Sequence, residues 1–219
     1  MPPWPPNPDY NHLAYEKVLS DYELTTINDW VDNGMPSGNL TLAPPPPVFS
    51  GGLTMDAPDD TVALPIYEIA TNDDVYVTFV VHSNYTETKY LNQLEFLPGD
   101  PSIVHHAIYY QDTSDLSWQM DADYPGIGYP SNELGNSQFA QTFGGYVPGQ
   151  GTVTFPSNMG IEILPGADFA IDVHYAPGNI GKMDSSKLFL KFCSVPNVRP
   201  IWQERYLFAA IPIPHRNYV

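Results

Sequence analysis

From residue 48 onward, short runs of alternating apolar and polar residues are interrupted by turn-forming residues. Alternation with a period of two is typical of strands that bury one face, and tight turns connect antiparallel neighbours. Turn signals such as Pro98-Gly99-Asp100 and Pro165-Gly166-Ala167 separate the runs. The strands that we expect span residues 75–82, 90–96, 103–110, 151–155, 168–175 and 187–193. The pattern predicts an all-β domain, an antiparallel β-sandwich resembling a jelly roll.

The composition supports a folded β domain. Hydrophobic residues make up 42% of the 219 residues, which argues against disorder across most of the chain. The 15 tyrosines favour strands, and the 24 prolines favour short strands joined by turns. Residues 112–150 are rich in Tyr, Gly, Pro and Asn, and we expect them to form a long ordered excursion over the surface.

The charge of the chain excludes two classes of partner. Aspartate and glutamate total 25 against 8 lysines and arginines, which gives a formal net charge of −17. A surface with this much negative charge repels phosphate backbones and anionic lipids, and we therefore expect no nucleic-acid partner. We also expect no membrane span. The single cysteine, Cys193, excludes an internal disulfide as well as Cys-x-x-Cys zinc and haem-attachment motifs, and we expect a buried, inert thiol.

The first 50 residues differ from the rest of the chain. Residues 1–35 comprise a proline-rich arm and a short amphipathic helix, and residues 36–50 form a proline-rich linker. Ser20 and Glu23 fit a capping box at the start of this helix, and Asn33-Gly34 supplies a stop. The apolar residues at helical spacing are Leu24, Ile27, Trp30 and Val31.

Three histidines lie within apolar strands. His105 and His106 are adjacent in the run at 103–110, and His174 lies in the run at 168–175. A buried imidazole needs a partner for each nitrogen, and that partner is either a hydrogen bond within the core or a metal such as copper, zinc or iron. Adjacent strand residues point to opposite faces, so His105 and His106 can bind one metal only if a bulge redirects one of them. We expect Asp172 to face away from His174.

Two segments around these histidines resemble the copper motifs of the copper type II, ascorbate-dependent monooxygenases, the family of peptidylglycine α-hydroxylating monooxygenase and dopamine β-monooxygenase. They are Pro98-Gly99-Asp100-Pro101-Ser102-Ile103-Val104-His105-His106-Ala107, and Leu164-Pro165-Gly166 followed by Ile171-Asp172-Val173-His174-Tyr175 and Met183-Asp184-Ser185-Ser186. The resemblance implies that residues 51–210 form a β-sandwich that binds one copper ion through His105, His106 and His174. It also implies that this copper, with ascorbate or another reductant as the electron source, relays an electron to a second copper.

In the family, the second copper lies in a following domain and uses a His-x-His pair and a methionine. No His-x-His occurs here, and His215 stands alone, so we expect this chain to hold at most half of such a site. Residues 211–219 would then begin the link to a second copper domain, or a further chain would supply it. Two alternatives remain: a copper-binding or electron-transfer module without oxygenase activity, and a structural β-sandwich of an extracellular assembly.

The N-terminal segment carries a second resemblance, to the end of a bacterial c-type cytochrome domain. It rests on the proline-rich opening from Met1 to Pro6 and on the stretch from Leu19 to Pro36. The resemblance implies that Met1 is an axial haem ligand, that the haem comes from sequence outside this chain, and that a cytochrome is a partner. Exported bacterial proteins join such modules, so we expect a periplasmic or extracellular location.

Overall fold

The computed structural model describes residues 18–45, 52–132, 136 and 139–202. The chain divides into two compact units, residues 1–50 and residues 51–219. Met1, His215 and the expected link at 211–219 lie outside the described residues.

The first unit contains the predicted helix, α1 (Asp21–Asp32), and a short 3₁₀ turn, η1 (Leu40–Leu42). The capping box is confirmed: the Glu23 backbone N–H donates to Ser20 Oγ at 3.3 Å, and the Ser20 N–H donates to the Glu23 carboxylate at 2.7 Å. The helix ends at Asp32 with Asn33 as its C-cap, and Gly34 follows with φ +79°, a conformation that glycine adopts without strain.

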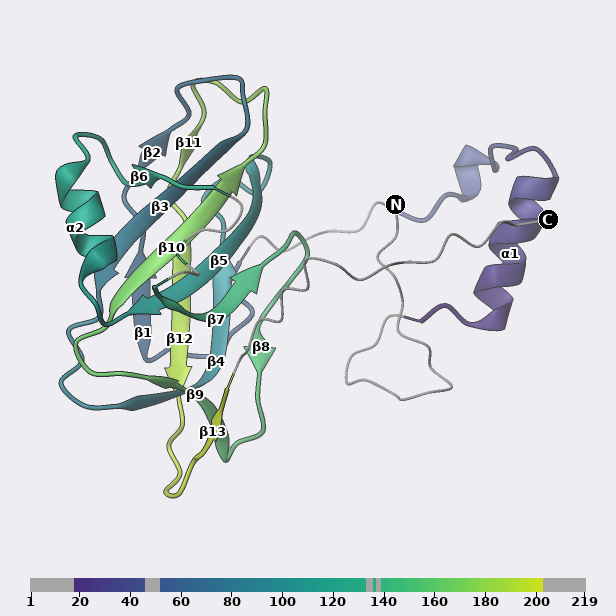
Figure 1. Ribbon diagram of the computed structural model, residues 1–219. Coiled ribbons are helices and arrows are strands. Elements are labelled where there is room, and N and C mark those ends of the chain that lie inside the picture. The colour runs from purple at the N-terminus through teal and green to yellow at the C-terminus, as the bar shows by residue number, and fades with distance from the viewer. Residues whose placement is uncertain (1–17, 46–51, 133–135, 137–138, 203–219) are drawn as a thin grey trace, which may run out of the picture. The chain divides into compact units, whose positions relative to one another are not determined.

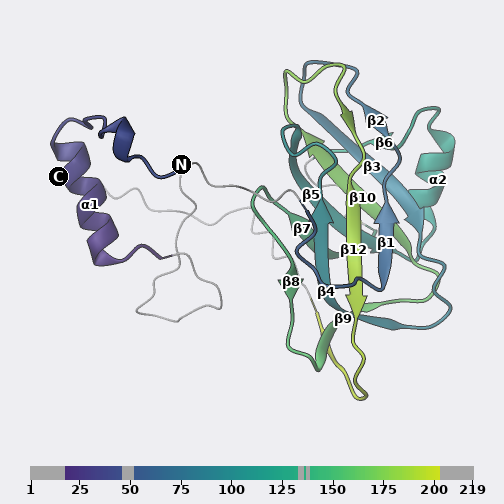
Figure 2. The ribbon, with the colours of Figure 1, turned by 180° about the vertical axis from the view of Figure 1, so that it is seen from behind.

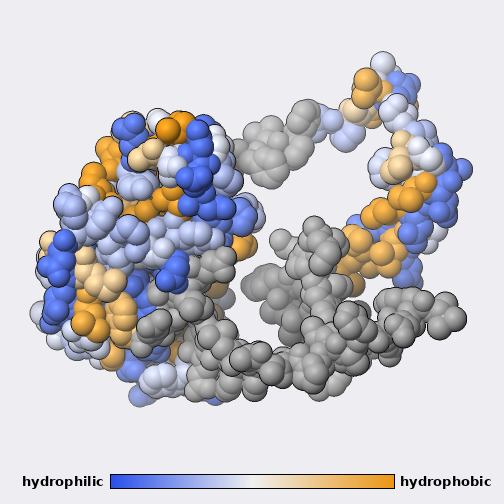
Figure 3. Space-filling model, turned by 45° about the horizontal axis from the view of Figure 1, so that its top comes forward, coloured by the Kyte–Doolittle hydropathy of each residue, from blue (hydrophilic) through white to orange (hydrophobic). Residues whose placement is uncertain are grey.

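The apolar side chains of α1 gather on one side of the helix (Figure 3). The predicted stripe is present, but its members remain 45–49% exposed, and no residue of α1 is buried. Isolated helices of this length are marginal in water. Within the described residues, α1 is therefore stabilised mainly by its own caps rather than by packing.

The second unit is built mostly of strands. Its described elements are β1 (Asp60–Ala63), β2 (Tyr67–Glu68), β3 (Val75–His82), β4 (Lys89–Leu97), β5 (Val104–Asp112), α2 (Leu116–Asp123), β6 (Tyr129–Pro130), β7 (Gln141–Tyr146), β8 (Val153–Thr154), β9 (Met159–Ile163), β10 (Asp168–Tyr175), β11 (Met183–Asp184), β12 (Lys187–Phe192) and β13 (Arg199–Ile201).

Two sheets face each other and form the predicted β-sandwich (Figures 1 and 2). One sheet has the order β6-β3-β10-β5-β7, and the other has the order β1-β12-β4-β9-β13, with β8 also paired to β4. A small third sheet pairs β11 with β2. All described pairings are antiparallel except that of β13 with β9, which is parallel.

The core lies between the two large sheets. Large apolar side chains from both sheets meet there, among them Phe79, Leu91, Phe96, Tyr109, Phe143, Phe169, Ile171 and Leu188. β10 is buried at every position. One face packs in this core, α2 contacts part of the other side and also β3, and Asn136 donates to Asp172 on that side. This central strand carries His174.

Strand prediction succeeds best for the long alternating runs. β3 and β10 coincide with the predicted spans 75–82 and 168–175, and β4, β5 and β12 differ from theirs by one or two residues. Only residues 153–154 of the span 151–155 form a strand. The excursion at 112–150 contains α2, β6 and β7, so it contributes a helix and two sheet strands that the sequence pattern does not indicate.

Candidate metal centre

A β-bulge brings the three histidines together. β5 and β10 pair so that His106 lies opposite His174, whereas the next pair is Val104 with Tyr175. His105 is therefore the extra residue, and the regular alternation of β5 breaks at the position where binding of one metal by both His105 and His106 would require a bulge. His105 is exposed, His106 is half-buried, and His174 is buried.

The Nδ1 atoms of His105 and His174 both lie close to Nδ1 of His106. His105 Nδ1 lies 3.0 Å from His106 Nδ1, and His174 Nδ1 lies 3.4 Å from the same atom. A metal that binds imidazole at about 2.0–2.1 Å in trigonal or tetrahedral geometry holds its nitrogens about 3.3–3.6 Å apart. The candidate ligand atoms all lie within 4.8 Å of one another, so the group could hold a metal ion.

Hydrogen bonding among the rings explains this arrangement less well than a metal does. Two ring nitrogens that face each other form a hydrogen bond only when one of them carries a proton. His106 Nδ1 faces two such nitrogens, and one proton cannot serve both contacts well. A cation at the centre accepts all three lone pairs at once.

Two further residues orient the His174 ring. The Asp74 carboxylate lies at the other ring nitrogen, with Oδ1 2.8 Å from Nε2. Tyr76 stacks flat on the imidazole, with 4.1 Å between the ring centroids and 5° between the planes. Tyr76 is the cross-strand partner of His174 on β3, so the strand register alone could have identified it. Asp74 is 100 residues away in the sequence, and no sequence signal marks it.

The position of Asp172 corrects one expectation. Its side chain shares a face with His174, because residues two apart on a strand point the same way. Asp172 is 6% exposed, and the Thr78 hydroxyl donates to its Oδ1. Burial raises the pKa of Asp172 to about 6, despite the hydrogen bonds that it accepts. The three residues His105, His106 and His174 are called the metal group below. A small cavity beside them is lined by Tyr76, His106, Ile108, Asn132, Asp172 and His174.

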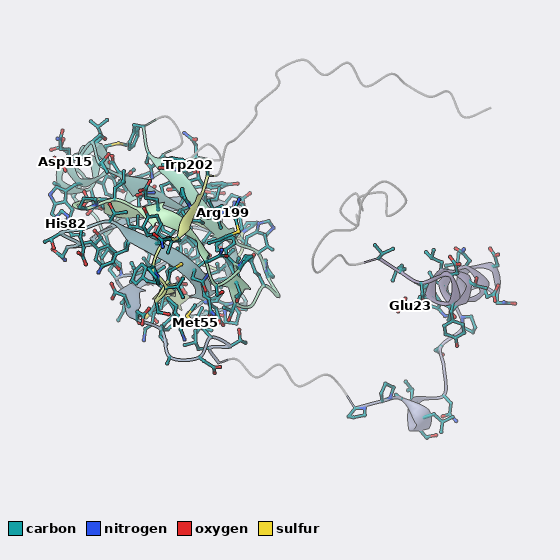
Figure 4. All side chains as sticks on the ribbon, turned by 90° about the horizontal axis from the view of Figure 1, so that it is seen from below. Glu23, Met55, His82, Asp115, Arg199 and Trp202 are labelled. Carbon is teal, nitrogen blue, oxygen red and sulfur yellow. The ribbon has the colours of Figure 1, made fainter. Side chains whose placement is uncertain are left out.

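His82 lies outside the histidine group. It ends β3, and its Nδ1 contacts the carboxylate of Asp168, the first residue of β10, whereas His174 lies near the last. Its ring packs on Trp118 of α2, with centroids 3.8 Å apart. His82 is about half exposed and lies at the same end of the unit as Asp115 (Figure 4). These contacts give His82 a structural role at the end of β3.

The other chemical candidates add no ligand. Among the described residues, His105, His106 and His174 form the one group of three or more histidines, cysteines and acids that could hold a metal. Cys193 is half-buried rather than buried, burial raises its pKa, and its thiol donates to the Met159 carbonyl oxygen at 3.3 Å.

No protein-family model matches the chain, and a search of curated proteins finds no match. The family resemblance of the histidine motifs therefore stays a prediction. Within the described part of the chain, no helix is long and apolar enough to cross a membrane.

Proposed function

We propose that this chain binds one copper ion through the Nδ1 atoms of His105, His106 and His174 and serves as an electron-relay domain. The observation that carries the proposal is that Nδ1 of His105 and Nδ1 of His174 lie 3.0 and 3.4 Å from Nδ1 of His106, on a bulge between two central strands. Copper would supply one-electron chemistry by cycling between Cu(I) and Cu(II).

The donor set favours copper over the other metals that imidazole binds. All three ligands are neutral imidazoles, and the metal group includes no thiolate or carboxylate. Affinity for divalent first-row metals rises to a maximum at copper, so a three-imidazole site without other selectivity takes copper first. His106 and His174 are held by paired strands, and Tyr76 and Asp74 fix the His174 ring.

The same residues provide a route for electrons. The His174 side is buried, and the exposed ring of His105 faces solvent. An electron that enters or leaves the metal would therefore pass most directly at the His105 edge. His106 and His174, on paired strands, would hold the ion from the buried side.

The resemblance to the copper monooxygenases suggests which group accepts the electron, namely a second copper ion. On that reading, the chain belongs to an exported protein, periplasmic or extracellular, whose second copper, oxygen and substrate meet in another domain or chain. Ascorbate or another reductant would supply the electron, and a cytochrome partner would be an alternative source. The isolated chain should therefore bind copper and hydroxylate nothing.

Metal competition with a redox readout tests the proposal. Copper should displace zinc from the full chain, and the Cu(II) form should show an electron paramagnetic resonance signal with nitrogen couplings. Ascorbate should abolish this signal, and reoxidation should restore it. A site that prefers zinc, or a Cu(II) signal that ascorbate does not reduce, would contradict an electron relay and favour a structural sandwich.

A further inference from the structure

The carboxylate of Asp74 contacts His174 on the side of the ring away from the other two histidines. It directly precedes β3, and its Oδ1 lies 2.8 Å from His174 Nε2. The His174 side chain is 9% exposed and that of Asp74 is 59% exposed. A solvent-facing carboxylate thus closes the outer side of a buried imidazole.

The backbone around Asp74 is anchored on both sides. Before it, the Thr71 hydroxyl donates to the Asp73 carboxylate at 2.8 Å, and the Asp73 N–H donates to Thr71 Oγ1 at 3.2 Å. The Gly178 N–H, from the loop after β10, donates to the Asn72 carbonyl oxygen at 2.9 Å. After it, β3 pairs with β10 along its whole length. Asp74 is therefore held over His174 by the fold.

This contact favours one tautomer of the neutral His174 ring. A carboxylate accepts a hydrogen bond, so Nε2 must carry the hydrogen that it donates to Asp74. In the neutral ring Nδ1 then keeps its lone pair, and Nδ1 is the atom that faces His106. Because Asp74 lies on the opposite side of the ring from Nδ1, it acts on a metal only through His174.

We propose that Asp74 is a positioning residue that selects Nδ1 as the metal-binding nitrogen of His174 and stabilises Cu(II) relative to Cu(I). The claim that Asp74 stabilises Cu(II) relative to Cu(I) rests on the copper-binding function proposed above. The negative charge of Asp74 makes the imidazole a stronger donor, and a stronger donor favours the more highly charged ion. Asp74 thus keeps Nδ1 of His174 available for metal binding in the metal-free chain. In the copper-bound chain it lowers the reduction potential of the ion.

The expected size of the effect is modest. Removing a residue that orients a metal ligand typically weakens metal binding about 10–100-fold. Asp74 is more than half exposed, so solvent screening places the expected loss at the lower end, about tenfold for Cu(II). A tenfold loss confined to Cu(II) raises the one-electron potential by about 59 mV.

The test uses four variants of the full chain: Asp74→Asn, Asp74→Ala, Asp74→Glu and, as a matched control, Asp73→Asn. The control removes the same charge one position away, from a carboxylate whose side-chain partner is Thr71. In the metal-free chain, nitrogen NMR shifts of His174 report the tautomer. In the loaded chain, competition titrations of Cu(II) and Cu(I) and the midpoint potential report the electronic effect.

We expect the unmutated chain and Asp74→Glu to hold the Nε2–H tautomer, whereas Asp74→Asn and Asp74→Ala populate both tautomers. The Asn and Ala variants should lose Cu(II) affinity about tenfold with a smaller loss for Cu(I), and Asp73→Asn should match the unmutated chain. An unchanged tautomer, or equal effects of Asp74→Asn and Asp73→Asn, would overturn the inference while leaving the copper function standing. A fixed tautomer in a chain that binds no copper would instead refute the proposed function and the redox half of the inference.

Discussion

Glu95 gives the sharpest test of how the sandwich is held together. Its side chain is 4% exposed on β4, and its carboxylate accepts hydrogen bonds from two segments distant in the sequence. Oε2 accepts from the Met55 N–H at 2.7 Å, from Thr54 Oγ1 at 2.8 Å and from Thr152 Oγ1 at 2.6 Å. The Thr54 N–H donates to Oε1 at 2.8 Å. One buried carboxylate thus joins the start of the second unit to the sheet.

Glu95→Gln removes the charge and keeps one carbonyl oxygen. A hydrogen bond to a charged group contributes about 1.5–3 kcal/mol. The NH₂ group of Gln would also place a hydrogen-bond donor against the N–H and O–H donors of Thr54, Met55 and Thr152. The four bonds are not additive, and the remaining carbonyl oxygen replaces part of them, so we expect a loss of about 2–4 kcal/mol in the free energy of unfolding. Urea unfolding at pH 7 measures this loss. Glu87→Gln is the control, because Glu87 is largely exposed and pairs only with Lys89 among described contacts.

The pH dependence supplies an independent check. Burial opposes ionisation of Glu95, but the hydrogen bonds from Thr152, Thr54 and Met55 outweigh it and lower the pKa. A pKa lowered by folding adds stability above the unfolded value of about 4.3, and this stability disappears as the pH falls through the folded value. The difference in the free energy of unfolding between the unmutated chain and Glu95→Gln should therefore decrease below about pH 4. A loss under about 1 kcal/mol at pH 7, or a difference independent of pH, would refute the argument.

Three further predictions concern the metal group. Deleting His105, the extra residue of the bulge, should let β5 pair regularly with β10 and give a folded chain without high-affinity copper binding, as circular dichroism and copper titration would show. Free copper at about 1,000 times its Kd should stabilise the fold by about 4 kcal/mol and raise Tm by about 8–16 °C in calorimetry. Removing residues 1–50 should leave copper affinity unchanged, because all three histidines and Asp74 lie in the second unit; a weakened affinity would contradict this.

Local signals explain which elements the sequence predicts. α1 has a capping box, a helical apolar stripe and an Asn-Gly stop, and β3 and β10 have long alternating runs. α2 has none of these: its N-cap Asp115 adopts φ +62° and makes no side-chain cap, and its apolar residues form no stripe. β2, β6 and β11 are two residues long, too short for a period to show.

The candidate site is predictable only in part. The two histidine motifs identify His105, His106 and His174. The geometry of a regular strand then implies that a bulge is needed for His105 and His106 to bind the same metal. Whether the bulge exists depends on how β5 and β10 pair, which no local pattern fixes. Asp74 shows the same limit, because its contact with His174 depends on tertiary structure rather than on a motif. Asp172 differs: its place on the same face as His174 follows from the predicted strand alone, so the expectation that it faces away was wrong on strand parity.

The most direct test of the account is an anaerobic Cu(I) titration of the full chain beside His174→Ala and His82→Ala. His82 is the matched control, because it sits on the same sheet but pairs with Asp168 rather than with the metal group. We expect about one tight copper per chain, lost or greatly weakened in His174→Ala and retained in His82→Ala. No tight copper in the unmutated chain, or equal binding by both variants, would contradict a metal centre at His105, His106 and His174.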